Sequence, residues 1–166
     1  MARAVAVTPF TFPGNQAAID DIVRHCRRIV TTRALMSAGV GIVPIPGLDI
    51  AADLVLLKRL IEEINTAFGL TPAQIERLSA PTRVLVYKAI VGFGGAMVGR
   101  ALSKEIIVRA LSVVGMRISM KQAAKYVPFA GQAVSAVLSY TAMKIVANQH
   151  IRDCARVAAE VIAVKR

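Results

Sequence analysis

Two pairs of histidine and cysteine are the side chains in this sequence best suited to bind a metal ion. His25 and Cys26 are adjacent, and His150 and Cys154 are four residues apart. Imidazole nitrogen and thiolate sulfur are common ligands of zinc in proteins. On a helix, residues four apart share a face, whereas adjacent residues point about 100° apart. A position on the polar side of its helix explains each histidine more simply, so we predict no metal site and no cofactor.

Other catalytic chemistry has little support. The chain has no Gly-Lys dipeptide, so the phosphate-binding loop G-x-x-x-x-G-K-[ST] cannot be formed. Asp53 is the one charged residue in the apolar stretch 50–57, where a buried carboxylate would need a partner. We expect an ion pair between helices, or a charge in the first turns of a helix, rather than a catalytic role. Candidate partners for Asp53 are Arg83, Lys88 and Lys144. The sequence therefore predicts a protein that is not an enzyme.

Composition and charge indicate the class of partner. The 166 residues are 55% hydrophobic and carry a formal net charge of +11, with a mean hydropathy of +0.57. No predicted helix combines a dense basic run with base-reading residues, so we do not expect nucleic acid as a partner. High hydropathy with positive charge is better suited to anionic lipid headgroups, and a solvated basic surface is the alternative. The candidate headgroup contacts are Arg24, Arg27, Arg28, Arg117, Lys121 and Lys125.

Helical periodicity and end signals predict most of the elements. Prolines and a glycine in residues 1–14 predict an extended N-terminal tail before a helical domain over 15–166. Asn15 is a plausible N-cap. Apolar residues at three- and four-residue steps from 50 to 68 predict an amphipathic helix that ends at Gly69. Thr71, with Gln74 three residues later, predicts a capping box for a short helix to about residue 78.

Glycines divide the second half of the chain. A helix is expected from Pro81 to about Leu102, which would place Gly95 and Gly99 one turn apart and allow close helix packing. Further helices are expected over 104–117 and 119–127. A last helix is expected from about Phe129 nearly to the C-terminus.

Two proline-glycine corners resemble each other. The first contains Pro44, Pro46 and Gly47, and the second contains Pro128 and Gly131; a long helix is expected after each. A duplicated helical hairpin or chance reuse of a good corner would both explain this echo. We predict an all-α fold, a single compact bundle of about five to seven helices. It could be built from two such cornered hairpins, and these corners are candidate membrane or partner contacts.

The first corner and the helix after it resemble a known family. Val43-Pro44-Ile45-Pro46-Gly47, then Asp53 and the closing Phe68-Gly69-Leu70, are similar to the helical domain of immunity-related GTPases. They also resemble the hydrophobic helical region of unknown function that follows some Era-like GTPases. The stretch from Val127 to Asp153 resembles the second half of that region, and EcsC-type proteins are a more distant comparison. The resemblance implies an all-α region that contacts membranes or partners. No GTPase domain is present in these residues, so nucleotide hydrolysis is not implied.

These observations lead to one main expectation and two alternatives. We expect a non-enzymatic, membrane-associated helical protein that binds an anionic membrane on its cytoplasmic side. A separately encoded GTPase or a second copy of the chain is a further candidate partner. Three charge-free runs, over residues 34–48, 89–99 and 126–143, do not by their hydropathy establish a membrane span. The alternatives are a soluble, self-associating helical adaptor and, with less support, a membrane-permeabilising effector.

Overall fold

The computed structural model describes residues 12–40, 48–93, 97–99 and 131–165. Side chains are described for these residues except 36–40, 48–54 and 131–139. Within these ranges the chain is helical and contains no strand, which confirms the predicted all-α class. The described helices are α1 (Gln16–Val40), α2 (Leu48–Ala67), α3 (Pro72–Glu76), α4 (Ala80–Phe93) and α7 (Gly131–Val164). The helices expected over 104–117 and 119–127 lie outside the described residues.

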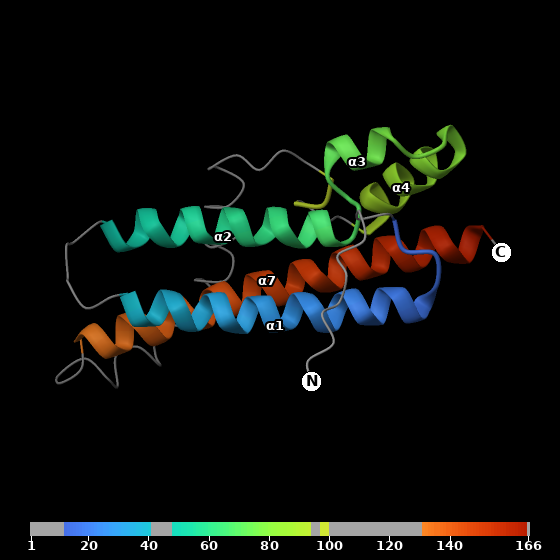
Figure 1. The fold of residues 1–166 in the computed structure, drawn as a ribbon. Helices are drawn as coiled ribbons and strands as arrows, with labels where there is room; N and C mark the ends of the chain where they lie inside the picture. The colour runs from blue at the N-terminus through green and yellow to red at the C-terminus, as the bar shows by residue number, and fades with distance from the viewer. Residues whose placement is uncertain (1–11, 41–47, 94–96, 100–130, 166) are drawn as a thin grey trace.

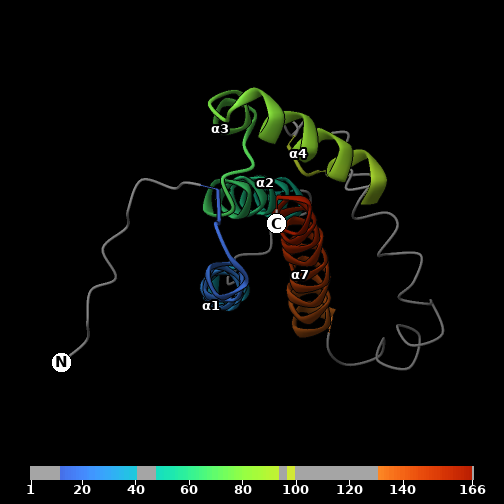
Figure 2. The ribbon, with the colours of Figure 1, turned by 90° about the vertical axis from the view of Figure 1, so that its right-hand side faces the viewer.

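Helix α7 is the centre of the bundle. It packs against α1, α2 and α4, while α1 also packs against α2 and α3 packs against α4. Helices α1, α2 and α7 run side by side along most of their length (Figure 1). Seen from the end, α1 lies on one side of α2, and α3 and α4 lie on the other (Figure 2). The outward faces of α1 and α4 therefore belong to opposite sides of the molecule.

The core follows from the spacing of apolar residues on these helices. Helix α1 buries Ile19, Cys26, Val30 and Ala34, which recur at steps of seven and four residues. Helix α7 contributes a stripe at three- and four-residue steps that continues for five turns, which places it at the centre. Its buried members are Met143, Val146, Ala147, His150, Ile151, Cys154, Val157, Ala158 and Val161.

The helix ends predicted from local chemistry are confirmed. The backbone N–H of Ala18 donates to the side chain of Asn15 at 2.8 Å, so Asn15 is the N-cap of α1. Gly69 has φ +70° just after α2. The N–H groups of Gly69 and Leu70 donate to the carbonyls of Thr66 and Asn65. This pair of bonds is the Schellman arrangement, which needs a left-handed residue where glycine has the least strain.

The capping box before α3 is also present. The Thr71 hydroxyl accepts from the backbone of Gln74, and the Gln74 side chain accepts from the backbone N–H of Thr71. The Gln74 amide also donates to the carbonyl of Thr66 at 3.1 Å. The capping box is therefore tied to the end of α2, which fixes the direction in which the chain leaves that helix.

The helix predicted from Pro81 to Leu102 is wrong at residues 97–99, which are not helical; residues 94–96 and 100–102 lie outside the described residues. Helix α4 ends at Phe93, and Gly99 lies in a turn with φ +67°. Gly99 therefore does not lie on the predicted helix, and Gly95 lies outside the described residues. Gly99 does allow close packing, but of another kind: a Cβ there would lie 2.8 Å from Cδ1 of Ile90 and 3.1 Å from Cδ1 of Ile75. Gly99 therefore packs against α3 and α4 from a turn, and not from within a helix.

Sequence spacing predicts only some of the ion pairs on the surface of α2. Lys58 and Glu62 approach to 3.8 Å, as their four-residue spacing predicts. Glu63, four residues after Arg59, pairs with Arg33 of α1 at 3.4 Å and not with Arg59, because α1 packs beside α2. Exposed pairs of this kind contribute on the order of 0–1 kcal/mol, so packing and not charge holds the two helices together.

Candidate functional site

A buried polar cluster lies where α2, α7 and the turn after α4 meet. The prediction that His150 lies on the polar side of its helix is wrong, because His150 is only 1% exposed. Its Nε2 is 2.9 Å from Oδ1 of Asn65, which is also buried. The Nδ2 of Asn65 donates to the carbonyl of Met97 at 3.2 Å. We call these three residues, Asn65, Met97 and His150, the Asn65 joint.

The hydrogen bonds of the joint fix the tautomer of His150. Since Nδ2 of Asn65 donates to the Met97 carbonyl, its Oδ1 is the acceptor that faces the imidazole. His150 must then carry its proton on Nε2 and donate it to Oδ1. Its Nδ1 is an unprotonated acceptor with no hydrogen-bond partner among the described residues. Burial also lowers the pKa of His150 from 6.5 to about 4, so the ring is neutral at pH 7.

The two buried cysteines, Cys26 and Cys154, are not suited to act as nucleophiles. The Sγ of Cys154 is 3.5 Å from Nε2 of His150 and 3.6 Å from Oδ1 of Asn65. Burial raises the pKa of Cys154 well above its ordinary value and that of Cys26 to about 12. Both groups are therefore neutral thiols, whereas nucleophilic attack and metal binding require the thiolate.

The four metal-binding candidates of the sequence are not brought together as one set. Cys26, His150 and Cys154 are buried, but His25 is exposed on α1. Among the residues that the structure describes, no three of the side chains His, Cys, Asp and Glu are placed to hold a metal ion. The two cysteines and His150 are buried in the core of the bundle.

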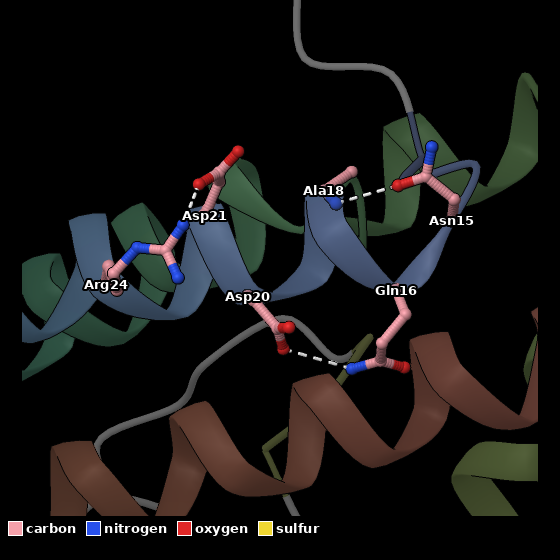
Figure 3. A network of polar contacts seen from close by, with 6 residues as sticks. All are labelled: Asn15, Gln16, Ala18, Asp20, Asp21 and Arg24. Atoms are coloured by element: carbon pink, nitrogen blue, oxygen red, sulfur yellow. Dashed lines mark hydrogen bonds and ion pairs between the residues drawn. The ribbon is translucent and has the colours of Figure 1, made fainter.

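The first basic cluster lies on α1 and is exposed. Arg24 forms an ion pair with Asp21, three residues earlier, next to the Gln16–Asp20 hydrogen bond (Figure 3). Arg27 and Arg28 form no ion pair within the described part of the chain. These two residues, rather than Arg24, are the free positive charges of the cluster.

Helix α4 carries an apolar surface on both sides. Thr82, Val86, Ala89 and Ile90 face the core, as their three- and four-residue steps require. Val84, Tyr87 and Val91 lie on the opposite side, at steps of three and four residues, and are 51%, 42% and 80% exposed. We call these three residues the outer face of α4. Exposed apolar side chains that lie side by side with a polar border often mark a surface that protein or lipid covers.

Cations border this outer face. Lys88 is exposed on one edge, and Arg83 lies on the other. Arg83 donates to Glu76 of α3 at 2.8 Å, and the Tyr87 hydroxyl donates to the same carboxylate at 2.9 Å. The carboxylate is thereby occupied, and α4 itself has no acidic residue. The outer face thus combines exposed apolar side chains with net positive charge.

Several predicted positions lie outside the described residues. Pro44, Pro46 and Gly47 of the first corner, Pro128 of the second, and the second basic cluster of Arg117, Lys121 and Lys125 are among them. Gly131 is the first residue of α7. Asp53 lies in α2, but its side chain is not described; of its candidate partners, Arg83 pairs with Glu76 and Lys144 donates to Tyr140.

Asn65 is the residue of this cluster that the sequence interpretation missed. It lies four residues after Ile61 and three before Phe68, on the apolar side of α2. A polar amide at such a position must find a buried partner. That spacing is the signal that could have identified it.

Comparison of the chain with protein-family models, curated proteins and solved structures found no match. The likeness to GTPase-associated helical regions therefore stays a prediction. Among the described helices, none is long and apolar enough to cross a membrane.

Proposed function

We propose that this protein is a non-enzymatic helical protein that binds the surface of an anionic membrane through α4. The observation that supports this most directly is the outer face of α4, where Val84, Tyr87 and Val91 are exposed beside Lys88. Apolar side chains with a basic edge are typical of helices that lie in the headgroup region of a bilayer. Tyrosine favours this region because its ring is apolar and its hydroxyl is polar.

Lipid is a better occupant of this surface than a second copy of the chain. A stable protein interface buries about 800 Å² on each partner. Three partly exposed side chains on one helix supply only a fraction of that area. A bilayer needs no matching surface, and the net charge of +11 attracts it from a distance of about one Debye length, near 8 Å at physiological salt.

Binding to vesicles tests this proposal. The purified chain should float with vesicles that contain anionic lipid and less with neutral vesicles, and added salt should weaken the interaction. Replacing Val84 and Val91 by aspartate should reduce binding at least tenfold. Each valine is about half or more exposed and would contribute on the order of 1 kcal/mol on transfer to the interface.

A matched control is available on the other side of the molecule. Leu35 of α1 is 60% exposed, so Leu35→Asp makes the same kind of change away from α4. It should leave vesicle binding unchanged. Equal loss in both variants, or no binding by the unaltered chain, would overturn the proposal. A concentration-dependent dimer that Val91→Asp disrupts would instead favour the self-associating adaptor.

A further inference from the structure

The Asn65 joint connects three segments that are distant in sequence. Asn65 is on α2, His150 is on α7, and Met97 belongs to the turn that follows α4. Val98 of the same turn is fully buried, and Gly99 lies against Ile90 of α4. The two hydrogen bonds of Asn65 therefore hold the end of the α4 segment against the α2–α7 pair.

We propose that the Asn65 joint is sensitive to acid: a proton taken up at Nδ1 of His150 opens it and releases residues 97–99 and the end of α4 from α2 and α7. In the tautomer that carries its proton on Nε2, Nδ1 has a free lone pair and can accept the second proton. Once protonated, Nδ1 becomes a donor, and no acceptor faces it among the described residues. The imidazolium would also be buried without an ion-pair partner among the described residues, which is costly in a protein interior.

Among the described residues, no carboxylate forms an ion pair or a hydrogen bond with His150. On α7 the titratable neighbours are Cys154, a neutral thiol, and Asp153, whose carboxylate accepts from Gln149 near the surface. From α1 the buried group is Cys26, also a neutral thiol. The carboxylates of α2, Glu62 and Glu63, are engaged with Lys58 and Arg33. On the α3–α4 side, Arg83 is held by Glu76 and Lys88 is exposed.

The direction and the pH range follow from linkage. Burial depresses the pKa of His150 from 6.5 to about 4, so the closed joint favours the neutral ring. The stability that this contributes is complete above about pH 6.5 and is lost as the pH falls from 6.5 towards 4. Within that range each pH unit multiplies the open population by about ten.

Hydrogen exchange of the full-length chain without lipid tests the joint directly. After correction for the intrinsic rate, opening at residues 97–99 should increase about 20-fold between pH 7 and pH 5. The α1–α7 core should change less. The chain has two histidines, so His25→Gln, at an exposed position, is a matched control that should keep this increase. His150→Gln places an amide N–H where Nε2–H lies and cannot titrate, so the increase should disappear.

A second measurement keeps the test decisive if the His150→Gln chain does not fold. Titration of the two imidazoles of the unaltered protein by NMR should place His150 below pH 5. A His150 that titrates near 6.5, or exchange at 97–99 that does not change with pH, would overturn the proposal.

The consequence for membranes rests on the proposed function. A released α4 can turn more of its apolar surface to lipid, so vesicle binding should increase at pH 5 in the unaltered chain and in His25→Gln but not in His150→Gln. Acid-dependent opening without vesicle binding at either pH would support the joint and overturn the proposed function. Vesicle binding together with hydrogen exchange at residues 97–99 that does not depend on pH would support the proposed function and overturn the joint.

Discussion

Replacing Asn65 by leucine is the most direct test of what the buried polar cluster contributes to stability. The Asn65 side chain is 2% exposed and makes two hydrogen bonds, one to the Met97 carbonyl at 3.2 Å and one from His150 at 2.9 Å. Leucine has nearly the same shape but can make neither. It therefore leaves a buried donor and a buried acceptor without partners, each costing about 1–3 kcal/mol.

The expected loss of unfolding free energy is about 1–5 kcal/mol. Two unsatisfied groups would cost roughly 2–6 kcal/mol, and the burial of a more apolar side chain offsets about 1 kcal/mol. For a chain of this length the loss corresponds to a decrease in Tm of roughly 2–20 °C. Urea denaturation at pH 7.5 measures the free energy, and an unchanged m-value would show that the denatured state is unaffected.

A double-mutant cycle with His150→Phe separates the joint from simple packing. The phenylalanine removes the donor that Asn65→Leu leaves unsatisfied, so the double variant should be more stable than the sum of the single changes by about 1–2 kcal/mol. Gln149→Leu is the control, because the Gln149 side chain is exposed and bonded only to surface groups. A loss below about 0.5 kcal/mol for Asn65→Leu, or strict additivity in the cycle, would refute this account.

Three further substitutions test the local geometry of the fold. Gly99→Ala should destabilise the chain by about 1–3 kcal/mol, because φ is +67° and the new methyl group would lie 2.8 Å from Ile90. Gly92→Ala should have the opposite effect, a gain of about 1 kcal/mol, because Gly92 is helical with open space around it. Thr71→Ala should cost about 1 kcal/mol through loss of the capping box of α3. Thermal melts compare all three, and a destabilising Gly92→Ala or a neutral Gly99→Ala would contradict the assignment of helix and turn.

The helix ends could be predicted because their chemistry is local. Asn15 bonds to the amide three residues later, and Thr71 and Gln74 satisfy each other within one turn. The left-handed Gly69 follows the last apolar step of α2. The atoms that decide each of these features lie within a few residues of one another, so the sequence alone contains the relevant information.

The end of α4 could not be predicted in this way. The apolar run from residue 89 to 99 satisfies a helical pattern at least as well as a turn, and glycine is compatible with both. What decides the outcome is the position of Gly99 against Ile90 and Ile75. That contact exists only after α3 and α4 have packed together, so tertiary packing overrides the local pattern.

The burial of His150 depends on a contact across the fold. Its spacing from Ala147, Ile151 and Cys154 places it on the apolar stripe of α7, but its partner Asn65 lies 85 residues earlier. Without that partner a histidine on this stripe would have an unsatisfied donor, so a surface position was the simpler expectation. The polar pair is acceptable in the core because the Asn65 amide satisfies both the Nε2–H of the imidazole and the Met97 carbonyl.

The arrangement of the helices bears on which candidate membrane surface, the basic cluster of α1 or the outer face of α4, would contact a bilayer. The free charges Arg27 and Arg28 are on α1, and the apolar outer face is on α4, on the other side of α2 (Figure 2). A flat bilayer that contacts the outer face of α4 therefore lies far from α1, where salt screens the charges within about 8 Å. In the proposed binding mode the arginines would add only long-range attraction, whereas the valines and the tyrosine would contact lipid. It follows that the affinity for vesicles should depend on the apolar side chains of α4 and that the basic residues of α1 should affect mainly the rate of encounter.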